Sequence, residues 1–163
     1  MGTLFNSEED RVSGIGGWLI LVAIGIVFSP IRIAGQIIPV YTEVFKSGVW
    51  SALTTPGSPN YHPLWAPLLL GEIGTNLLLI ALWIFIAVLF FNKKKSFPKW
   101  YIGAMAFSLG FVVINAFSIK IVMPDAPVFD VETATEIGRT VIATAIWIPY
   151  MLVSERVANT FVE

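Results

Sequence analysis

Seven polar or charged residues lie inside apolar stretches of this sequence, where each side chain needs a hydrogen-bonding partner. They are Arg32, Gln36, Glu72, Asn76, Asn115, Glu136 and Arg139. Two arginines can hold an anionic group through paired hydrogen bonds. Carboxylates and side-chain amides can instead pair with the arginines themselves. The residue types therefore predict either an anion-binding cavity or a structural network of polar side chains.

The apolar stretches around these residues are long enough to cross a bilayer. Hydrophobic residues make up 56% of the 163 residues and charged residues only 13%, whereas soluble domains have about 25% charged residues. A transmembrane helix needs about 20 predominantly apolar residues. The sequence predicts an all-α integral membrane protein with one membrane domain, residues 1–163, and four spans at about 16–39, 68–91, 101–122 and 134–154.

The segments between the predicted spans differ in charge. Residues 40–66 form a long loop whose first part has apolar residues at helical spacing, which predicts a short amphipathic helix lying on the membrane. The loop at residues 92–100 contains Lys93, Lys94, Lys95 and Lys99. Short loops rich in lysine stay cytoplasmic. We therefore expect both termini and residues 92–100 inside, and residues 40–66 outside.

One segment recurs near the end of the chain. EIGTNLLLIALWIF at residues 72–85 and EIGRTVIATAIWIP at residues 136–149 share six of fourteen positions at an offset of 64. Each copy lies in the second apolar run of a pair. The spacing predicts two tandem helical hairpins, related by an axis along the membrane normal.

Helical rise places the polar residues in the outer third of the membrane. At 1.5 Å per residue, Arg32, Asn76, Asn115 and Arg139 lie roughly 22 Å from the cytoplasmic edge of a core about 30 Å thick. Gln36, Glu72, Glu136 and Lys120 lie roughly one turn further out. A guanidinium at this depth is costly if it faces lipid. We expect Arg32 to contact Glu72 or Asn76 first, and Asn115 second.

Several functional classes lack support in the sequence. It has no cysteine and one histidine, His62, in a loop without a nearby carboxylate partner. No catalytic triad, HExxH motif or nucleotide-binding loop occurs. The glycines at 14, 16 and 17 favour a helix start or close packing over a phosphate loop, since no Lys-Ser/Thr pair follows. We predict no enzyme activity, cofactor, metal or nucleic-acid partner.

Two functions are compatible with this pattern. The first is a non-catalytic accessory or structural membrane protein with a buried polar layer. The alternative is a small transporter, or half of one, that binds an anionic solute or lipid headgroup through Arg32 and Arg139. The lipid bilayer is the expected partner in both cases, and a homo-oligomer suits the alternative because four helices enclose little space.

Three segments carry a resemblance to a known family. They are SGIGGWLIL at residues 13–21, PKWYIG at residues 98–103 and WIPYMLVSERVANTF at residues 147–161. The chain resembles, over nearly its whole length, a family of bacterial inner-membrane proteins with a domain of unknown function, number 2569. The resemblance implies four transmembrane helices and a location in the bacterial inner membrane. It implies no activity.

Overall fold

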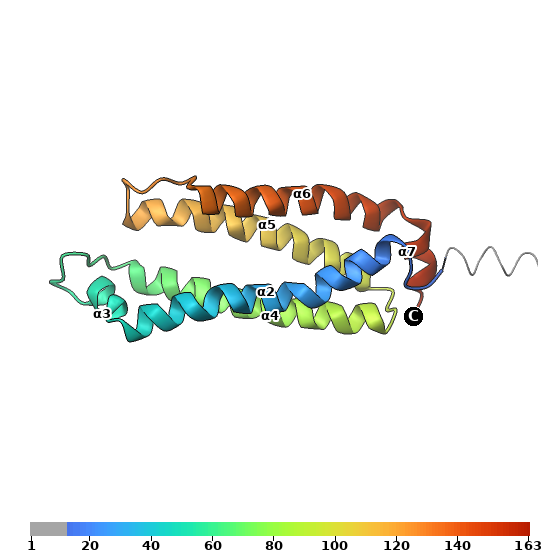
Figure 1. The fold of residues 1–163 in the computed structure, drawn as a ribbon, viewed down its shortest axis with the longest axis horizontal. Helices are drawn as coiled ribbons and strands as arrows, with labels where there is room; N and C mark the ends of the chain where they lie inside the picture. Colours follow the sequence, from blue (N-terminus) through green and yellow to red (C-terminus); the bar gives the residue numbers. More distant parts are fainter. Residues whose placement is uncertain (1–12) are drawn as a thin grey trace, which may run out of the picture.

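The computed structural model describes residues 13–163, which form helices and connecting loops without strands. Four helices are long and apolar enough to cross a membrane (Figure 1). They are α2 (Trp18–Lys46), α4 (Trp65–Phe91), α5 (Phe97–Val122) and α6 (Val131–Val153). Two short helices, α3 (Val49–Thr54) and α7 (Glu155–Thr160), lie outside the long ones. The predicted all-α membrane fold with four spans is confirmed.

The helix α2 extends seven residues beyond its predicted end, because Pro39 does not terminate it. The first half of the expected surface helix is therefore the last two turns of α2. The chain breaks at Gly48, which has a positive φ of 82° that favours glycine. Across this break the rings of Phe45 and Trp50 lie 5.1 Å apart. Only α3 remains as a separate short helix in the loop.

The other three long helices begin before the predicted spans. The helix α4 starts at Trp65 instead of residue 68, and α5 starts at Phe97 with Pro98 in its first turn. Proline is tolerated there because the first amides of a helix have no intrahelical acceptor. The helix α6 starts at Val131, after Asp130, whose side chain accepts a hydrogen bond from the Thr133 amide.

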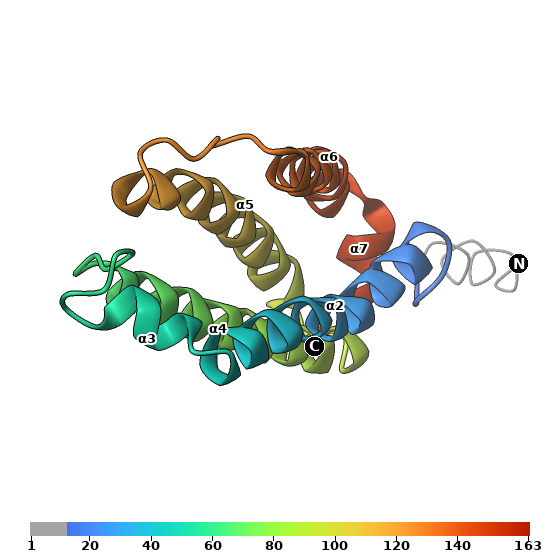
Figure 2. The same cartoon turned by 60° about the vertical axis from the view of Figure 1, so that its left-hand side comes forward.

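The four helices pack as two hairpins. The helix α2 packs mainly on α4, α5 packs on α6, and α4 also contacts α5, so the order in space is α2, α4, α5, α6. Figure 2 shows α4 and α5 close together at residues 92–96 and diverging toward α3. We call these ends the closed end and the open end. The relation of the hairpins by internal duplication stays a prediction.

The closed end contains an aromatic cluster, which α7 and the C-terminal residues complete. The ring of Phe97 lies 4.3 Å from that of Phe161 and 5.1 Å from that of Phe90. All three side chains are buried. Backbone hydrogen bonds from Lys95 N to Glu163 O, 2.6 Å, and from Glu163 N to Lys93 O, 3.3 Å, hold the last residue against the loop. The segment after α6 is thus part of the core.

The helix α7 also fixes the start of α2. Arg156 Nη1 donates a hydrogen bond to Ser13 O at 3.1 Å, and Thr160 Oγ1 donates one to Gly14 O at 3.3 Å. A Cβ atom at Gly16 would lie 3.1 Å from Arg156 Nη1. Gly17 precedes α2 with a φ of 55°. These glycines therefore serve close packing and a helix start, in agreement with the sequence-based interpretation.

Candidate functional site

A cavity of about 540 Å³ lies between the two hairpins at the open end. Its walls come from α2, α4 and α5, from the loop before α6, and from the first turns of α6. The divergence of α4 and α5 leaves this space, since the aromatic cluster draws the same helices together only at the closed end. We call it the open-end pocket.

The polar side chains of the open-end pocket are carboxylates, amides and hydroxyls. No lysine, arginine or histidine lines it within residues 13–163. Five of the seven residues predicted from the sequence are among the lining residues: Gln36, Glu72, Asn76, Asn115 and Glu136. The structure adds polar residues that the sequence analysis did not assign to the site: Tyr41, Ser118, Asp130, Glu132 and Thr133.

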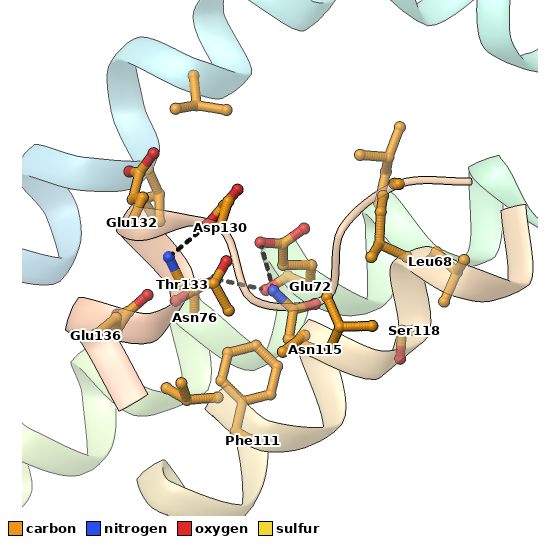
Figure 3. A pocket seen from close by; sticks show the side chains of 18 of the residues that line it. Leu68, Glu72, Asn76, Phe111, Asn115, Ser118, Asp130, Glu132, Thr133 and Glu136 are labelled. Atoms are coloured by element: carbon orange, nitrogen blue, oxygen red, sulfur yellow. Dashed lines mark hydrogen bonds between the residues drawn. The ribbon is translucent and has the colours of Figure 1, made fainter. Parts of the chain in front are cut away.

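Glu72 is the centre of the hydrogen bonds in this pocket (Figure 3). Asn115 Nδ2, on α5, donates to Glu72 Oε1 at 3.2 Å. Asn76 Nδ2 donates to the backbone oxygen of Glu72 at 3.0 Å, one turn along α4. The phenol of Tyr41, on α2, also forms a hydrogen bond with the Glu72 carboxylate. Glu72 thereby links three helices, and none of its partners here carries a positive charge.

The beginning of α6 contributes the remaining carboxylates. Asp130 Oδ1 accepts a hydrogen bond from Thr133 N at 2.7 Å, so it caps the helix. Glu132 and Glu136 are four residues apart and share one face of α6. In Figure 3, Asp130, Glu132 and Glu136 gather around the same space as Glu72 and Asn115. Each of Glu132 and Glu136 lacks an ion pair within residues 13–163.

The cap at Asp130 gives a prediction for pH dependence. The Thr133 backbone N–H lowers the pKa of the Asp130 carboxyl below its usual value. Because the folded-state pKa is below the unfolded one, the cap stabilises the protein above the unfolded pKa of about 3.9. This contribution is lost as pH falls through the folded-state pKa. In detergent, the wild type should melt slightly above Asp130→Asn at about pH 6, and the difference should shrink steadily as the pH falls below the unfolded pKa of about 3.9. A difference independent of pH would contradict the assignment.

The two arginines do not line the pocket. Arg32 and Arg139 are both exposed, and neither forms a hydrogen bond or ion pair with any residue in 13–163. The expected contact between Arg32 and Glu72, Asn76 or Asn115 is therefore absent from the structure. Asn115 and Tyr41 take the place at Glu72 that was expected for Arg32. Lys120, expected at the outer level, donates to Pro124 O at 2.8 Å beside the end of α5.

Apart from Ser118, which lies in the predicted span 101–122, the residues missed by sequence reasoning lay in segments taken for loops. Tyr41 was assigned to the loop after residue 39. It belongs to α2, where it lies one turn after Ile37 on the same face of the helix. Asp130 and Glu132 belong to an acidic run visible in the sequence, and Asp130 with Thr133 has the spacing of a helix N-cap. That spacing could have placed the start of α6 at the correct residue.

The carboxylates are too dispersed to form a compact ligand set for a metal ion. Residues 13–163 contain no group of three or more His, Cys, Asp or Glu side chains placed to hold one. The arrangement can instead accommodate a larger cationic group. Carboxylates would compensate its charge, and the amides of Gln36, Asn76 and Asn115 would add hydrogen bonds.

Comparisons with known proteins identify a family. A model of the family described as protein of unknown function (DUF2569) matches residues 12–162, nearly the whole chain. No curated protein and no solved structure matches it. The four apolar helices indicate a multi-pass membrane protein. The chain belongs to the DUF2569 family.

Proposed function

We propose that this protein is a non-catalytic, multi-pass membrane protein that binds a small cationic group, of the organic ammonium type, in the open-end pocket. The observation that carries this proposal is the lining of the pocket. Four carboxylates, from Glu72, Asp130, Glu132 and Glu136, face a cavity of about 540 Å³ that no basic side chain enters within the described residues.

Electrostatics favours a positive ligand in such a cavity. Carboxylates of like charge in a partly enclosed site repel one another, and a cation that enters relieves the repulsion. Aromatic rings in the same wall, from Tyr41, Trp65 and Phe111, can stabilise an ammonium group through cation–π contacts. The same lining argues against an anionic solute, since neither Arg32 nor Arg139 contributes to it.

An accessory or binding role agrees with the sequence better than catalysis does. The only histidine of the chain, His62, lies outside the pocket, so no hydroxyl group in the lining is paired with an imidazole base. His62 accepts a local hydrogen bond from the Leu64 amide at 3.2 Å, as a loop residue does.

We further propose that the protein lies in a bacterial inner membrane with its closed end in the cytoplasm. Lys93, Lys94, Lys95 and Lys99 cluster at that end, where the chain also terminates (Figure 1). Short lysine-rich loops stay cytoplasmic. The open-end pocket would then face the periplasm.

Reporter fusions test this orientation. A cytoplasmic reporter enzyme fused after Ser96 and a periplasmic one fused after Ser58 should both be active. The exchanged pair, with each reporter at the other position, should be inactive. Activity of the exchanged pair alone would reverse the orientation, and the pocket would then open to the cytoplasm.

The charge preference of the pocket can be measured directly because the chain contains no cysteine. Thr133→Cys places one thiol in the lining. In lipid nanodiscs, a cationic methanethiosulfonate reagent should modify it roughly tenfold faster than an anionic reagent of similar size. Thr135→Cys, two residues along α6 and outside the pocket lining, is the matched control and should show a smaller ratio. Equal rates for both reagents in the Thr133→Cys variant would refute the proposal.

A further inference from the structure

The four long helices leave one side of the bundle open. In the spatial order α2, α4, α5, α6, the helices α2 and α6 are the two outer ones. Within residues 13–163, no extensive packing joins them. They meet at the closed end, where the rings of Trp18 and Trp147 lie 6.4 Å apart. We call the side of the bundle between α2 and α6, from this contact to the open-end pocket, the lateral seam.

Helical spacing places Arg32 on the seam face of α2. Arg32 follows Trp18 by 14 residues and Gln36 follows it by 18, close to four and five turns of 3.6 residues. Trp18 contacts α6 and Gln36 lines the pocket, so the three residues share the face of α2 that borders the seam. The core residues Val22 and Ile33 lie to one side of the Trp18–Gln36 line on α2, and Arg32 lies to the other side, away from the core.

The same reasoning places Arg139 on the other wall of the seam. Glu136 and Trp147 are 11 residues apart, close to three turns, and therefore share one face of α6. Glu136 lines the pocket and Trp147 contacts Trp18. Arg139 lies between them, eight residues before Trp147 and beside this face. Both exposed arginines thus border the seam, one from each hairpin.

The arginines lie one turn deeper than the pocket residues beside them. Arg32 is four residues, roughly 6 Å, closer to the closed end than Gln36. Arg139 is three residues, roughly 4.5 Å, closer to the closed end than Glu136. A ligand in the seam would therefore have the two guanidinium groups on the side of the closed end and the carboxylates of the pocket on the side of the open end. The apolar side chains next to the arginines, Ile31 at 61% and Ile142 at 61% exposed, are accessible to lipid.

We propose that the seam and the pocket together bind a phospholipid whose headgroup ends in a primary ammonium. Its phosphate would bind Arg32 and Arg139, its ammonium would enter the pocket beside Glu72 and Glu136, and its acyl chains would remain in the bilayer. The order of charges matches, because in a phospholipid the phosphate lies nearer the membrane centre than the terminal ammonium. This inference rests on the proposed cation site and adds the anionic half of the ligand.

A lipid suits this site better than a soluble zwitterion of the same chemistry. The arginines have no partner of their own within residues 13–163, and a guanidinium at membrane depth needs an anion or water. Guanidinium groups match phosphate geometry well. Lipid phosphate is available from the bilayer at the seam, whereas a soluble molecule would have to enter through the pocket.

Lipid retention measured by native mass spectrometry tests the proposal. The wild type would be released from mixed micelles containing equal amounts of dioleoyl phosphatidylethanolamine, phosphatidylcholine and phosphatidylglycerol. We expect at least fivefold more bound phosphatidylethanolamine than either other lipid. Arg32→Gln/Arg139→Gln should lose most of this lipid, and Arg32→Lys/Arg139→Lys should keep a larger part. Lys46→Gln, which removes a charge outside the seam, is the matched control and should behave as the wild type.

The outcomes separate this proposal from the cation site itself. Equal retention of the three lipids by the wild type, or unchanged retention in the folded Arg→Gln variant, would overturn the lipid assignment. If soluble O-phosphoethanolamine, but not the lipid, protects the Thr133→Cys thiol from the cationic reagent, the ligand is soluble and the lipid assignment is wrong while the cation site stands. If the cationic reagent modifies the Thr133→Cys thiol no faster than the anionic reagent does, both proposals are wrong.

Discussion

Replacing Glu72 by glutamine should lower the ratio of cationic to anionic labelling of the Thr133→Cys thiol by roughly fivefold. Glu72 is the partly buried carboxylate that accepts hydrogen bonds from Asn115 and interacts with Tyr41. Charges that are partly buried are screened less by salt than exposed charges. The loss of this one negative charge should therefore change the potential in the pocket more than the neutralisation of an exposed carboxylate in its wall.

Glu132→Gln is the matched control for this experiment. It makes the same chemical change in the same pocket lining, but Glu132 is exposed to solvent. We expect less than a twofold effect, and one that disappears at high salt. Glutamine at position 72 can still accept from Asn115, so the melting temperature should stay close to that of the wild type. Equal effects of both variants would show that Glu72 has no special place in the site.

The number of long apolar helices followed from the sequence. Apolar runs of sufficient length predict spans directly, and helical rise placed Gln36, Glu72, Asn76, Asn115 and Glu136 on two neighbouring levels. The structure brings these five residues to one cavity. Such an estimate depends only on the position of a residue along its own helix. Small errors at the helix ends hardly change the estimate.

The pairing within this layer could not be predicted in the same way. Depth says nothing about the direction in which a side chain leaves its helix, or which helices are neighbours. Arg32 is four residues before Gln36, yet its side chain is exposed and does not line the pocket that Gln36 borders. The choice of Asn115 as the partner of Glu72 depends on the contact between α4 and α5, which hairpin connectivity alone does not specify.

The packing of the closed end could not be predicted either, for a different reason. Residues 155–160 are polar in composition, and their role depends on contacts with residues more than 140 positions away in the sequence, such as Arg156 with Ser13. Local patterns cannot reveal such contacts. One local signal was present, since Ser154 accepts a hydrogen bond from the Val157 amide at 3.4 Å and serine is a favoured N-cap residue.

Replacing Phe161 by alanine should strongly lower the stability of the closed end. Its side chain is 4% exposed and its ring lies 4.3 Å from Phe97 and 5.5 Å from Phe90. Truncation of a buried phenylalanine costs about 3–5 kcal/mol, which should lower the melting temperature in detergent by roughly 10 °C. Trypsin should also cleave after Arg156 faster in this variant, because α7 would detach from the start of α2.

Phe91→Ala provides the control for the loss of a large apolar side chain. Phe91 neighbours the same cluster through Phe90, with ring centroids 5.3 Å apart, but its side chain is 55% exposed. It should therefore shift the melting temperature only slightly and leave cleavage after Arg156 unchanged. If Phe161→Ala melts no lower than Phe91→Ala, the C-terminal residues do not belong to the core. The convergence of α4 and α5 at the closed end would then require another cause, and so would the pocket that their divergence leaves at the open end.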